Sequence, residues 1–594
     1  MNETAPPPPP QRPQKPPPTN KTAGRLIMGI AGFGLLAFVG LTVGALLLAR
    51  QEWSPTVSEN SFLELHVGGD ISDAPEEGGL FMDPNDFPPI LTEVTAAVRR
   101  AATDERIKGL YVEIEAAPGG WSSTQELRDA LVAFGESGKP CYAFANALDN
   151  KAYYLATGCK EIYLAPAGLL LVNGLSATTS YYLGTFEKIG VQGSFEHVGD
   201  FKSAIEPYQR TGPSDPASEA MDMLIGGLYD QMVAGIAQGR GVEPAQVQAW
   251  IDNPPITGES ALAAGMINGL KYRDEVADDM AGEERTGLGS YIKSNSALLP
   301  KSKKIAVIHV EGTIIDGESG SPFFGGRMVG DQTVAEYFED VREDDEVAAV
   351  VLRVNSPGGS GLASDNMWRE VERTKAAGKP VVVSMGDYAA SGGYYISAGA
   401  DRILAEPGTI TGSIGVFGGK LALGGAYEKL GITSHTWQRG QMANIFSELT
   451  VFSDPERAKF REFLEGFYGV FLDRVATGRK MEKEKVHEVA QGRVWTGQQA
   501  LERGLVDELG GLERALVVAR ELGKVAEGEE VDILRLPRQK TFFEQLAEDM
   551  QPQAVAPELM LPGVREAWSQ LEAVSRALEG SGVAAMMPGV VDIH

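Results

Sequence analysis

Ser391 is the residue of this sequence whose surroundings most clearly favour chemistry. It lies among small residues in the run 387–395, Asp-Tyr-Ala-Ala-Ser-Gly-Gly-Tyr-Tyr. An apolar run of strand length, 381–385, precedes it, and the residues after it can begin a helix. A hydroxyl at such a turn is open to a substrate, and a helix N-terminus favours negative charge that develops nearby. The alternative is a tight turn in which serine is merely small.

A serine hydroxyl is a weak nucleophile, so Ser391 needs a base that accepts its proton. No histidine lies within 40 residues after it. A lysine can serve if burial lowers its pKa from about 10.4 to roughly 7–8. Lys202 lies among apolar residues with Asp200 and Glu206 nearby, a setting compatible with partial burial. The alternative is a solvated surface charge, as most lysines are.

An internal repeat connects these two residues. The spacing between recurring motifs stays at 239 to 241 residues, which indicates two copies of one domain, about 60–285 and 300–535. The motifs include Gly-Lys-Pro at 138–140 and 378–380, Pro-Gly-Gly at 118–120 and 357–359, and Tyr-Tyr at 153–154 and 394–395.

Each copy lacks a reactive residue that the other has. The first copy carries Asn150 at the position of Ser391, and the second carries Ala443 at the position of Lys202. This complementary loss favours one composite site, with the nucleophile from the second copy and the base from the first. The sequence leaves open whether the two meet within one chain or between subunits.

A candidate oxyanion hole lies in the second copy. The run 355–359, Asn-Ser-Pro-Gly-Gly, follows a predicted strand and precedes a predicted helix. Glycines let backbone N–H groups approach a ligand closely, and a tetrahedral oxyanion needs two such donors. Gly358 or Gly359 is a candidate for one donor and Gly392 for the other. The alternative is an ordinary Pro-Gly-Gly turn.

The elements that position these residues alternate between strand and helix. In the second copy, apolar patterns predict strands at 304–310, 348–354 and 381–385, and helices at 334–342 and 362–377. This order predicts an α/β fold with a mostly parallel sheet covered by helices. Each copy also has a longer predicted helix, at 217–239 and at 455–478.

The two ends of the chain differ from the repeats. Residues 1–25 are rich in proline and mostly positive in charge, and 26–49 contain no charged residue. That span is long enough to cross a ~30 Å hydrocarbon core, so we predict an uncleaved transmembrane anchor. The preceding basic residues predict a cytoplasmic N-terminus. The tail 536–594 is loosely amphipathic and suits either packing on the domains or contact with the membrane.

Composition excludes several classes of function. The 594 residues carry a formal net charge of −28, which argues against a nucleic-acid partner. The only two cysteines, Cys141 and Cys159, lie in apolar segments. We expect each to be a small buried hydrophobic residue rather than part of a disulfide. The six histidines show no zinc-site spacing, so we expect no metal and no cofactor.

Several segments together resemble the signal peptide peptidase A family in its long tandem form, also called protease IV. The segments are Asn-Ser-Pro-Gly-Gly-Ser at 355–360, Ala-Ala-Ser-Gly-Gly-Tyr-Tyr-Ile-Ser at 389–397, Thr-Ile-Thr-Gly-Ser-Ile-Gly-Val-Phe-Gly at 409–418, Lys-Ser-Ala-Ile-Glu-Pro-Tyr at 202–208 and Gln-Gly-Arg-Val-Trp-Thr-Gly at 491–497. The resemblance covers about 60–535 and the anchor, but not the proline-rich N-terminus.

The resemblance implies two tandem ClpP/crotonase-like domains and a Ser–Lys dyad. In this dyad Ser391 is the nucleophile, Lys202 is the general base, and Ser413 orients the lysine by a hydrogen bond. It also implies a bowl-shaped homotetramer on the outer face of the inner membrane, in the periplasm where an outer membrane exists. The implied substrates are signal peptides left in the membrane after release from preproteins.

Two other functions fit parts of the sequence. A crotonase-like acyl-CoA enzyme also uses a backbone oxyanion hole, but it needs neither Ser391 nor Lys202, and CoA binding would identify it. A non-catalytic membrane scaffold of the same fold would not be acylated by serine-directed probes.

Overall fold

The computed structural model describes the two repeats and a short C-terminal segment. The described residues are 57–68, 71–75, 89–279, 284–294, 301, 303–320, 326–538 and 583–586. The predicted proline-rich segment, the predicted anchor and most of the predicted tail lie outside them. Within the described part of the chain, no helix is long and apolar enough to cross a membrane.

The first repeat is built on a parallel sheet with the strand order β6-β4-β3-β2-β1-β7. Its strands are β1 (Ser61–Gly68), β2 (Ile107–Ala116), β3 (Cys141–Leu148), β4 (Glu161–Leu170), β6 (Gly269–Leu270) and β7 (Arg285–Gly287). Its helices are α2 (Leu91–Thr103), α3 (Trp121–Glu136), α4 (Asn150–Ala156), α5 (Leu183–Ile189), α6 (Glu206–Gln209), α7 (Asp215–Arg240), α8 (Pro244–Asp252), α9 (Gly258–Ala263), α10 (Arg273–Asp279) and α11 (Leu288–Ser294).

The second repeat has the same topology. The order β18-β14-β13-β11-β8-β19 matches the first sheet strand for strand, and β15 and β17 extend it beside β13. Its strands are β8 (Lys304–Glu311), β11 (Val347–Ser356), β13 (Val381–Ala390), β14 (Arg402–Ala405), β15 (Ile410–Gly412), β17 (Val494–Thr496), β18 (Glu508–Leu509) and β19 (Asp532–Leu536). Its helices are α12 (Asp331–Glu343), α13 (Gly361–Ala376), α14 (Gly392–Ser397), α15 (Gly424–Lys429), α16 (Asp454–Arg479), α17 (Lys483–Val489), α18 (Gly497–Glu502) and α19 (Leu512–Leu522). The predicted internal repeat and parallel α/β architecture are confirmed.

The predicted elements of the second repeat are confirmed within a few residues. The largest extension is in the strand predicted at 381–385, which continues to Ala390. The two long helices begin at capping residues that local sequence explains. The Ser214 side chain accepts from the Ala217 N–H at the start of α7, and Ser453 forms a capping box with Glu456 at the start of α16.

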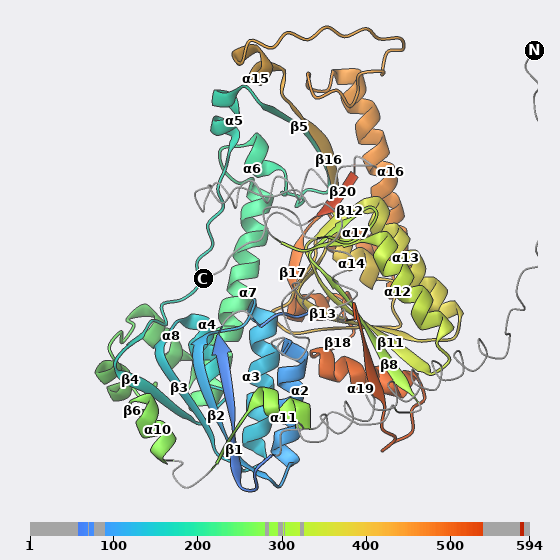
Figure 1. The fold of residues 1–594 in the computed structure, drawn as a ribbon. Helices are drawn as coiled ribbons and strands as arrows, with labels where there is room; N and C mark the ends of the chain where they lie inside the picture. Colours follow the sequence, from blue (N-terminus) through green and yellow to red (C-terminus); the bar gives the residue numbers. More distant parts are fainter. Residues whose placement is uncertain are drawn as a thin grey trace, which may run out of the picture. The chain divides into compact units, whose positions relative to one another are not determined.

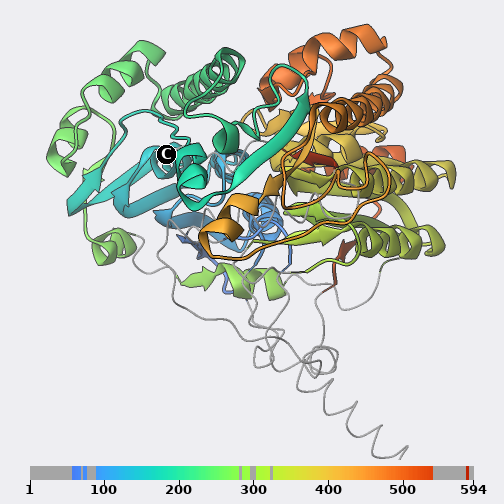
Figure 2. The same ribbon diagram turned by 90° about the horizontal axis from the view of Figure 1, so that it is seen from above.

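A third sheet combines strands from both repeats and has the order β10-β9-β12-β20-β16-β5. Its strands are β5 (Gln192–Val198), β9 (Thr313–Ile315), β10 (Met328–Gly330), β12 (Gly358–Ser360), β16 (Val416–Ala422) and β20 (Val583–Met586). Strand β5 of the first repeat runs antiparallel to β16 of the second (Figure 1). Figure 2 shows the two repeats from above, the first mainly blue to green and the second mainly yellow to orange.

A buried ion network also joins the two repeats. Arg353 in β11 is 1% exposed, and its guanidinium pairs with Asp73 at 2.9 Å and with Glu126 of α3 at 2.8 Å. Burial by itself lowers the pKa of Arg353. The two carboxylates raise it by more than burial lowers it, so the guanidinium stays charged. A buried arginine with two hydrogen-bonded partners fixes how α3 of the first repeat lies against the second sheet.

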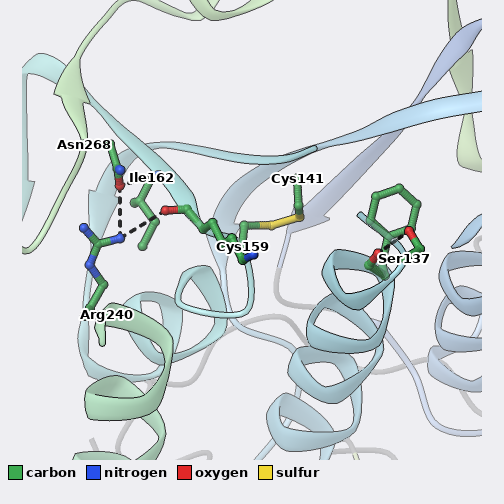
Figure 3. Close-up of a disulfide and its surroundings, with 8 residues drawn as sticks. Ser137, Cys141, Cys159, Ile162, Arg240 and Asn268 are labelled. Carbon is green, nitrogen blue, oxygen red and sulfur yellow. Dashed lines mark hydrogen bonds between the residues drawn. A yellow bond between two sulfur atoms is a disulfide. The ribbon is translucent and has the colours of Figure 1, made fainter. Parts of the chain in front are cut away.

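The two cysteines form a disulfide, so the expectation of two small hydrophobic residues is wrong. Cys141 begins β3, and Cys159 lies in the turn after α4, with a Cα–Cα distance of 5.0 Å (Figure 3). The parallel register pairs Tyr142 with Glu161, which brings the two cysteines to the same end of neighbouring strands. This proximity depends on strand register, which a pattern of apolar residues does not reveal.

Candidate active site

Ser391 lies at the junction of β13 and α14, the strand-to-helix turn that the sequence predicts. Its backbone has φ 56° and ψ −111°, a conformation that residues other than glycine seldom adopt. Its N–H donates to the Gly412 carbonyl at 2.8 Å, and its carbonyl accepts from the Tyr395 N–H at 2.8 Å. The residue is fully buried, so the expectation of a hydroxyl open to a substrate is not met in this structure. These bonds hold a strained turn in place, and the position of the hydroxyl is therefore defined.

The amine of Lys202 lies against this hydroxyl. Lys202 Nζ is 2.7 Å from Ser391 Oγ, 3.0 Å from Ser413 Oγ and 3.0 Å from the Ser413 carbonyl oxygen. The lysine is 1% exposed, and burial lowers its pKa well below the usual value of 10.5. A neutral amine at hydrogen-bond distance from a serine hydroxyl can accept its proton.

The acidic residues near Lys202 in sequence do not pair with it. The Glu206 carboxylate instead accepts from Ser214, at 2.9 Å from the N–H and 2.6 Å from the hydroxyl. A carboxylate paired with the amine would raise the pKa of Lys202, whereas burial alone accounts for its lowering here.

The shared third sheet explains how two repeats build one site. In the antiparallel register of β5 and β16, Val198 pairs with Val416. Lys202 follows Val198 by four residues, and Ser413 precedes Val416 by three. The two strands therefore bring the lysine and its serine partner to the same end of one ribbon. The bond from the Ser391 N–H to the Gly412 carbonyl, at the end of β15, holds the end of β13 beside them.

The segment 491–493 binds the backbone just before Lys202 and the backbone of Ser413. The Phe201 N–H donates to the Gln491 carbonyl at 2.9 Å, and the Ser413 N–H donates to the Arg493 carbonyl at 2.7 Å. Gly492 has φ 82°, and a Cβ there would lie 2.6 Å from the Lys202 backbone. Only glycine permits this approach. Sequence resemblance marks this segment, but its contact with Lys202 is visible only in the fold.

The glycines predicted to form an oxyanion hole lie beside the serine. Gly392 opens α14, so its N–H has no carbonyl partner within the helix. Gly358 has φ 101°, and its N–H donates to Ser356 Oγ at 3.1 Å. A Cβ on Gly393 would lie 2.7 Å from the Ser356 carbonyl oxygen, so α14 and the 356–359 turn are in close contact. Gly359 pairs with Ile314 of β9.

Strand β20 runs next to these glycines. Its backbone pairs antiparallel with β12, with Gly358 opposite Met586, and antiparallel with β16, with Phe417 opposite Ala584. A segment from the far end of the chain thus lies as an extended strand between the oxyanion candidate and the ribbon that carries Ser413. The space between β12 and β16 accommodates an extended peptide backbone.

The position equivalent to Ser391 in the first repeat has no hydroxyl. Asn150 is 6% exposed. Its side-chain N–H groups donate to the side-chain oxygen of Asn173 at 3.2 Å and to the backbone carbonyl of Gly174 at 3.0 Å. Its side-chain oxygen accepts from both backbone N–H groups of the same two residues. These four hydrogen bonds use both ends of the Asn150 amide to hold the backbone at 173–174, which indicates a structural role for this residue.

Comparisons with known proteins place the chain in a family. The model of peptidase family S49 matches residues 133–286 and 373–526. The chain is 32% identical to a serine protease named SPPA, chloroplastic, of Arabidopsis thaliana, over 81% of this chain and 73% of that one. It is 34% identical to Protease 4 of Haemophilus influenzae, over 72% of each chain. A solved variant of ClpP1 from Listeria monocytogenes is 13% identical with a TM-score of 0.24, over 36% of this chain and 95% of that one.

Proposed function

Because the chain belongs to peptidase family S49 and is a serine protease of that family, we propose that it is a membrane-anchored endopeptidase that degrades remnant signal peptides with a Ser391–Lys202 dyad. The observation that carries this proposal is the 2.7 Å distance between Lys202 Nζ and Ser391 Oγ, with the amine buried. Both properties are what a lysine needs to act as a general base at moderate pH.

The proposed reaction has two stages. The neutral amine of Lys202 takes the proton of the Ser391 hydroxyl as Oγ bonds to the peptide carbonyl carbon. The N–H groups of Gly392 and of Gly358 or Gly359 stabilise the resulting oxyanion. The C–N bond then breaks, the lysine ammonium gives its proton to the leaving amine, and an acyl-enzyme forms on Ser391. Lys202 then takes a proton from a water molecule as the water oxygen bonds to the acyl carbon. The lysine ammonium returns that proton to Ser391 Oγ as the bond between Oγ and the acyl carbon breaks, which releases a carboxylic acid.

An extended peptide is the ligand that the neighbouring strands favour. Strands β12 and β16 both pair with β20, so main-chain hydrogen bonding at the site is sterically feasible. A substrate that adds a strand gains affinity from its backbone and specificity from alternate side chains. This arrangement supports a peptide rather than an acyl-CoA substrate. The choice of signal peptides rests on the sequence resemblance and on the apolar character of those peptides.

We place the catalytic repeats outside the cytoplasm, anchored by residues 26–49, as a homotetramer. The Cys141–Cys159 disulfide supports this location, because disulfides persist in oxidising compartments and are rare in the cytosol. Protease accessibility in intact spheroplasts, and the mass of the detergent-solubilised protein by light scattering, test the location and the assembly.

Labelling with a fluorophosphonate, read by mass spectrometry from pH 6 to pH 10, tests the dyad. We expect an adduct on Ser391 that forms faster as the pH rises through the lowered pKa of Lys202. Ser391→Ala abolishes the adduct, and Lys202→Ala reduces its rate by at least about a thousandfold. An adduct that survives the loss of Lys202 would assign the base elsewhere. Absence of an adduct in folded wild-type protein would favour the scaffold.

A further inference from the structure

Asp387 lies four residues before Ser391, and its carboxylate is bound by the first repeat. Its Oδ2 accepts from the Gly120 N–H at 2.8 Å and from Ser123 Oγ at 2.7 Å, and its Oδ1 accepts from the Ser123 N–H at 2.9 Å. The residue is 7% exposed. Three hydrogen bonds to a buried carboxylate form a strong and directional attachment.

The loop that binds this carboxylate is the first-repeat counterpart of the oxyanion loop. Residues 118–120 correspond to 357–359 in the repeat, and both are Pro-Gly-Gly. A Cβ on Gly119 or Gly120 would lie within 2.8 Å of the Asp387 carboxylate, so a side chain at either position would displace the carboxylate from its present place. The loop that can bind a substrate oxyanion in the second repeat binds a side-chain anion in the first.

Strand β13 is irregular where Asp387 leaves it. In the parallel register with β11, Val354 pairs with Met385 and Ser356 pairs with Ala389. Two steps along β11 therefore correspond to four along β13, and the extra residues form a bulge that contains Asp387. Bulges re-aim side chains and weaken local pairing. The residues just before Ser391, 388–390, pair with β15, so the bulge at Asp387 is the point where the first repeat contacts the strand that leads to Ser391.

The start of α3 also contacts the segment 408–409, which leads through β15 to Ser413. Gln125 Oε1 accepts from the Gly408 N–H at 2.6 Å, and the Thr409 hydroxyl lies 3.2 Å from Ser122 Oγ. Strand β15 and Ser413 follow directly. The start of one helix of the first repeat thus contacts two segments of the second, the one that precedes Ser391 and the one that precedes Ser413.

We propose that Asp387 is a positioning residue for Ser391, held by the first repeat's counterpart of the oxyanion loop. The exchange between repeats is reciprocal: the first repeat supplies Lys202 to the second, and the second supplies Asp387 to the first. Removing the carboxylate frees the bulge and lets the Ser391 turn leave its strained conformation. This role rests on the proposed function of Ser391 as the nucleophile.

The first test compares Asp387→Ala and Asp387→Asn in the full-length protein. We expect the alanine variant to slow fluorophosphonate labelling of Ser391 by about 10- to 100-fold, equivalent to one or two hydrogen bonds. The asparagine variant keeps one acceptor oxygen, so its labelling rate should fall by less than that of the alanine variant. The pH midpoint of labelling stays unchanged, because Asp387 does not touch Lys202. Peptide cleavage loses kcat with little change in KM.

Asp149→Ala is the matched control. Asp149 caps α4 by accepting from the Ala152 N–H at 2.8 Å, within the first repeat. Its loss removes one carboxylate–amide bond of an exposed residue within the first repeat, so labelling should stay within about twofold of wild type. Equal slowing in this control would assign the effect of Asp387→Ala to general destabilisation and overturn the proposal.

Ser123→Ala tests the same link from the other repeat, and also serves if Asp387→Ala does not fold. It should slow labelling by about three- to tenfold. Combined with Asp387→Ala it should add nothing further, because both changes break one interaction. Fully additive losses would overturn the proposal.

Hydrogen exchange gives a readout that does not depend on catalysis. The Ser391 N–H, bonded to the Gly412 carbonyl, should exchange at least about tenfold faster in Asp387→Ala but not in Asp149→Ala. If wild type is never labelled on Ser391, the proposed function fails while this measurement still tests the positioning. Unchanged exchange in Asp387→Ala, with or without slower labelling, would overturn the positioning role.

Discussion

The Nζ atom of Lys202 and the Oγ atom of Ser391 lie 2.7 Å apart although 189 residues separate them in the chain. Both residues are buried, and Ser413, the residue directly after β15, accepts hydrogen bonds from the lysine amine. The contact forms within one chain, because β5 of the first repeat and β16 of the second pair directly.

The buried lysine predicts a specific dependence of stability on pH. Its pKa is lowered in the folded protein, so between that value and about 10.4 the unfolded chain binds more protons than the folded one. The free energy of unfolding therefore rises with pH in this window, by up to about 1.4 kcal/mol per pH unit from this group. Lys202→Met removes that contribution. Urea unfolding of both proteins from pH 7 to pH 10 should show curves that diverge, with wild type gaining relative to the variant; parallel curves would mean that Lys202 stays charged when folded.

Gly358→Ala should impair catalysis more than folding. Gly358 has φ 101°, where an L side chain is strained, and it lies in the oxyanion candidate. Rearrangement of this loop removes a donor, which typically costs 10²- to 10³-fold in kcat. Gly378→Ala is the matched control, since Gly378 has φ 88° and open space around it. Peptide turnover should fall in the first variant and stay near wild type in the second, with melting temperature monitored for both. Similar turnover in the two variants would exclude the 358–359 loop from the oxyanion hole.

Removing the disulfide should reduce stability without changing the chemistry. The bond closes a loop with a sequence separation of 18 residues, for which chain entropy predicts a loss of about 3 kcal/mol. The equivalent positions in the second repeat are Val381 and Ala400, where the Val381 backbone bonds Asp401 instead. Cys141→Ala/Cys159→Ala should therefore unfold at lower denaturant, yet Ser391 should label at the wild-type rate under native conditions. A large fall in labelling would tie the disulfide to the site.

Strand β20 predicts that the C-terminal segment competes with substrate. Its backbone pairs with Gly358–Ser360 and with β16, where we expect an extended peptide to bind. A tethered strand acts at high effective concentration, so a chain that ends at Gly582 should show KM for a peptide reduced by about tenfold. Ala585→Pro in the full-length chain removes one N–H and should produce a smaller change in the same direction. An unchanged or higher KM in both variants would mean that peptides bind elsewhere.

The sequence predicts the fold of each repeat with little help from tertiary structure. Apolar periodicity is a local property, and it indicates the strands at 304–310 and 348–354 and the helix between them. The steady spacing of short motifs reveals the duplication, and comparison of the two copies singles out Lys202 as the partner of Ser391 because Ala443 and Asn150 stand in their places.

By itself the sequence determined the repeated α/β architecture, the turn that bears Ser391 and the choice of Ser391 and Lys202 as candidate reactive side chains. Only the tertiary structure decided that these side chains meet within one chain, that Cys141 bonds Cys159, and that Asp387 is bound by the first repeat. The physical reason is that propensity and periodicity act over a few residues along the chain. Strand register and the docking of one repeat on the other instead depend on packing between segments up to several hundred residues apart.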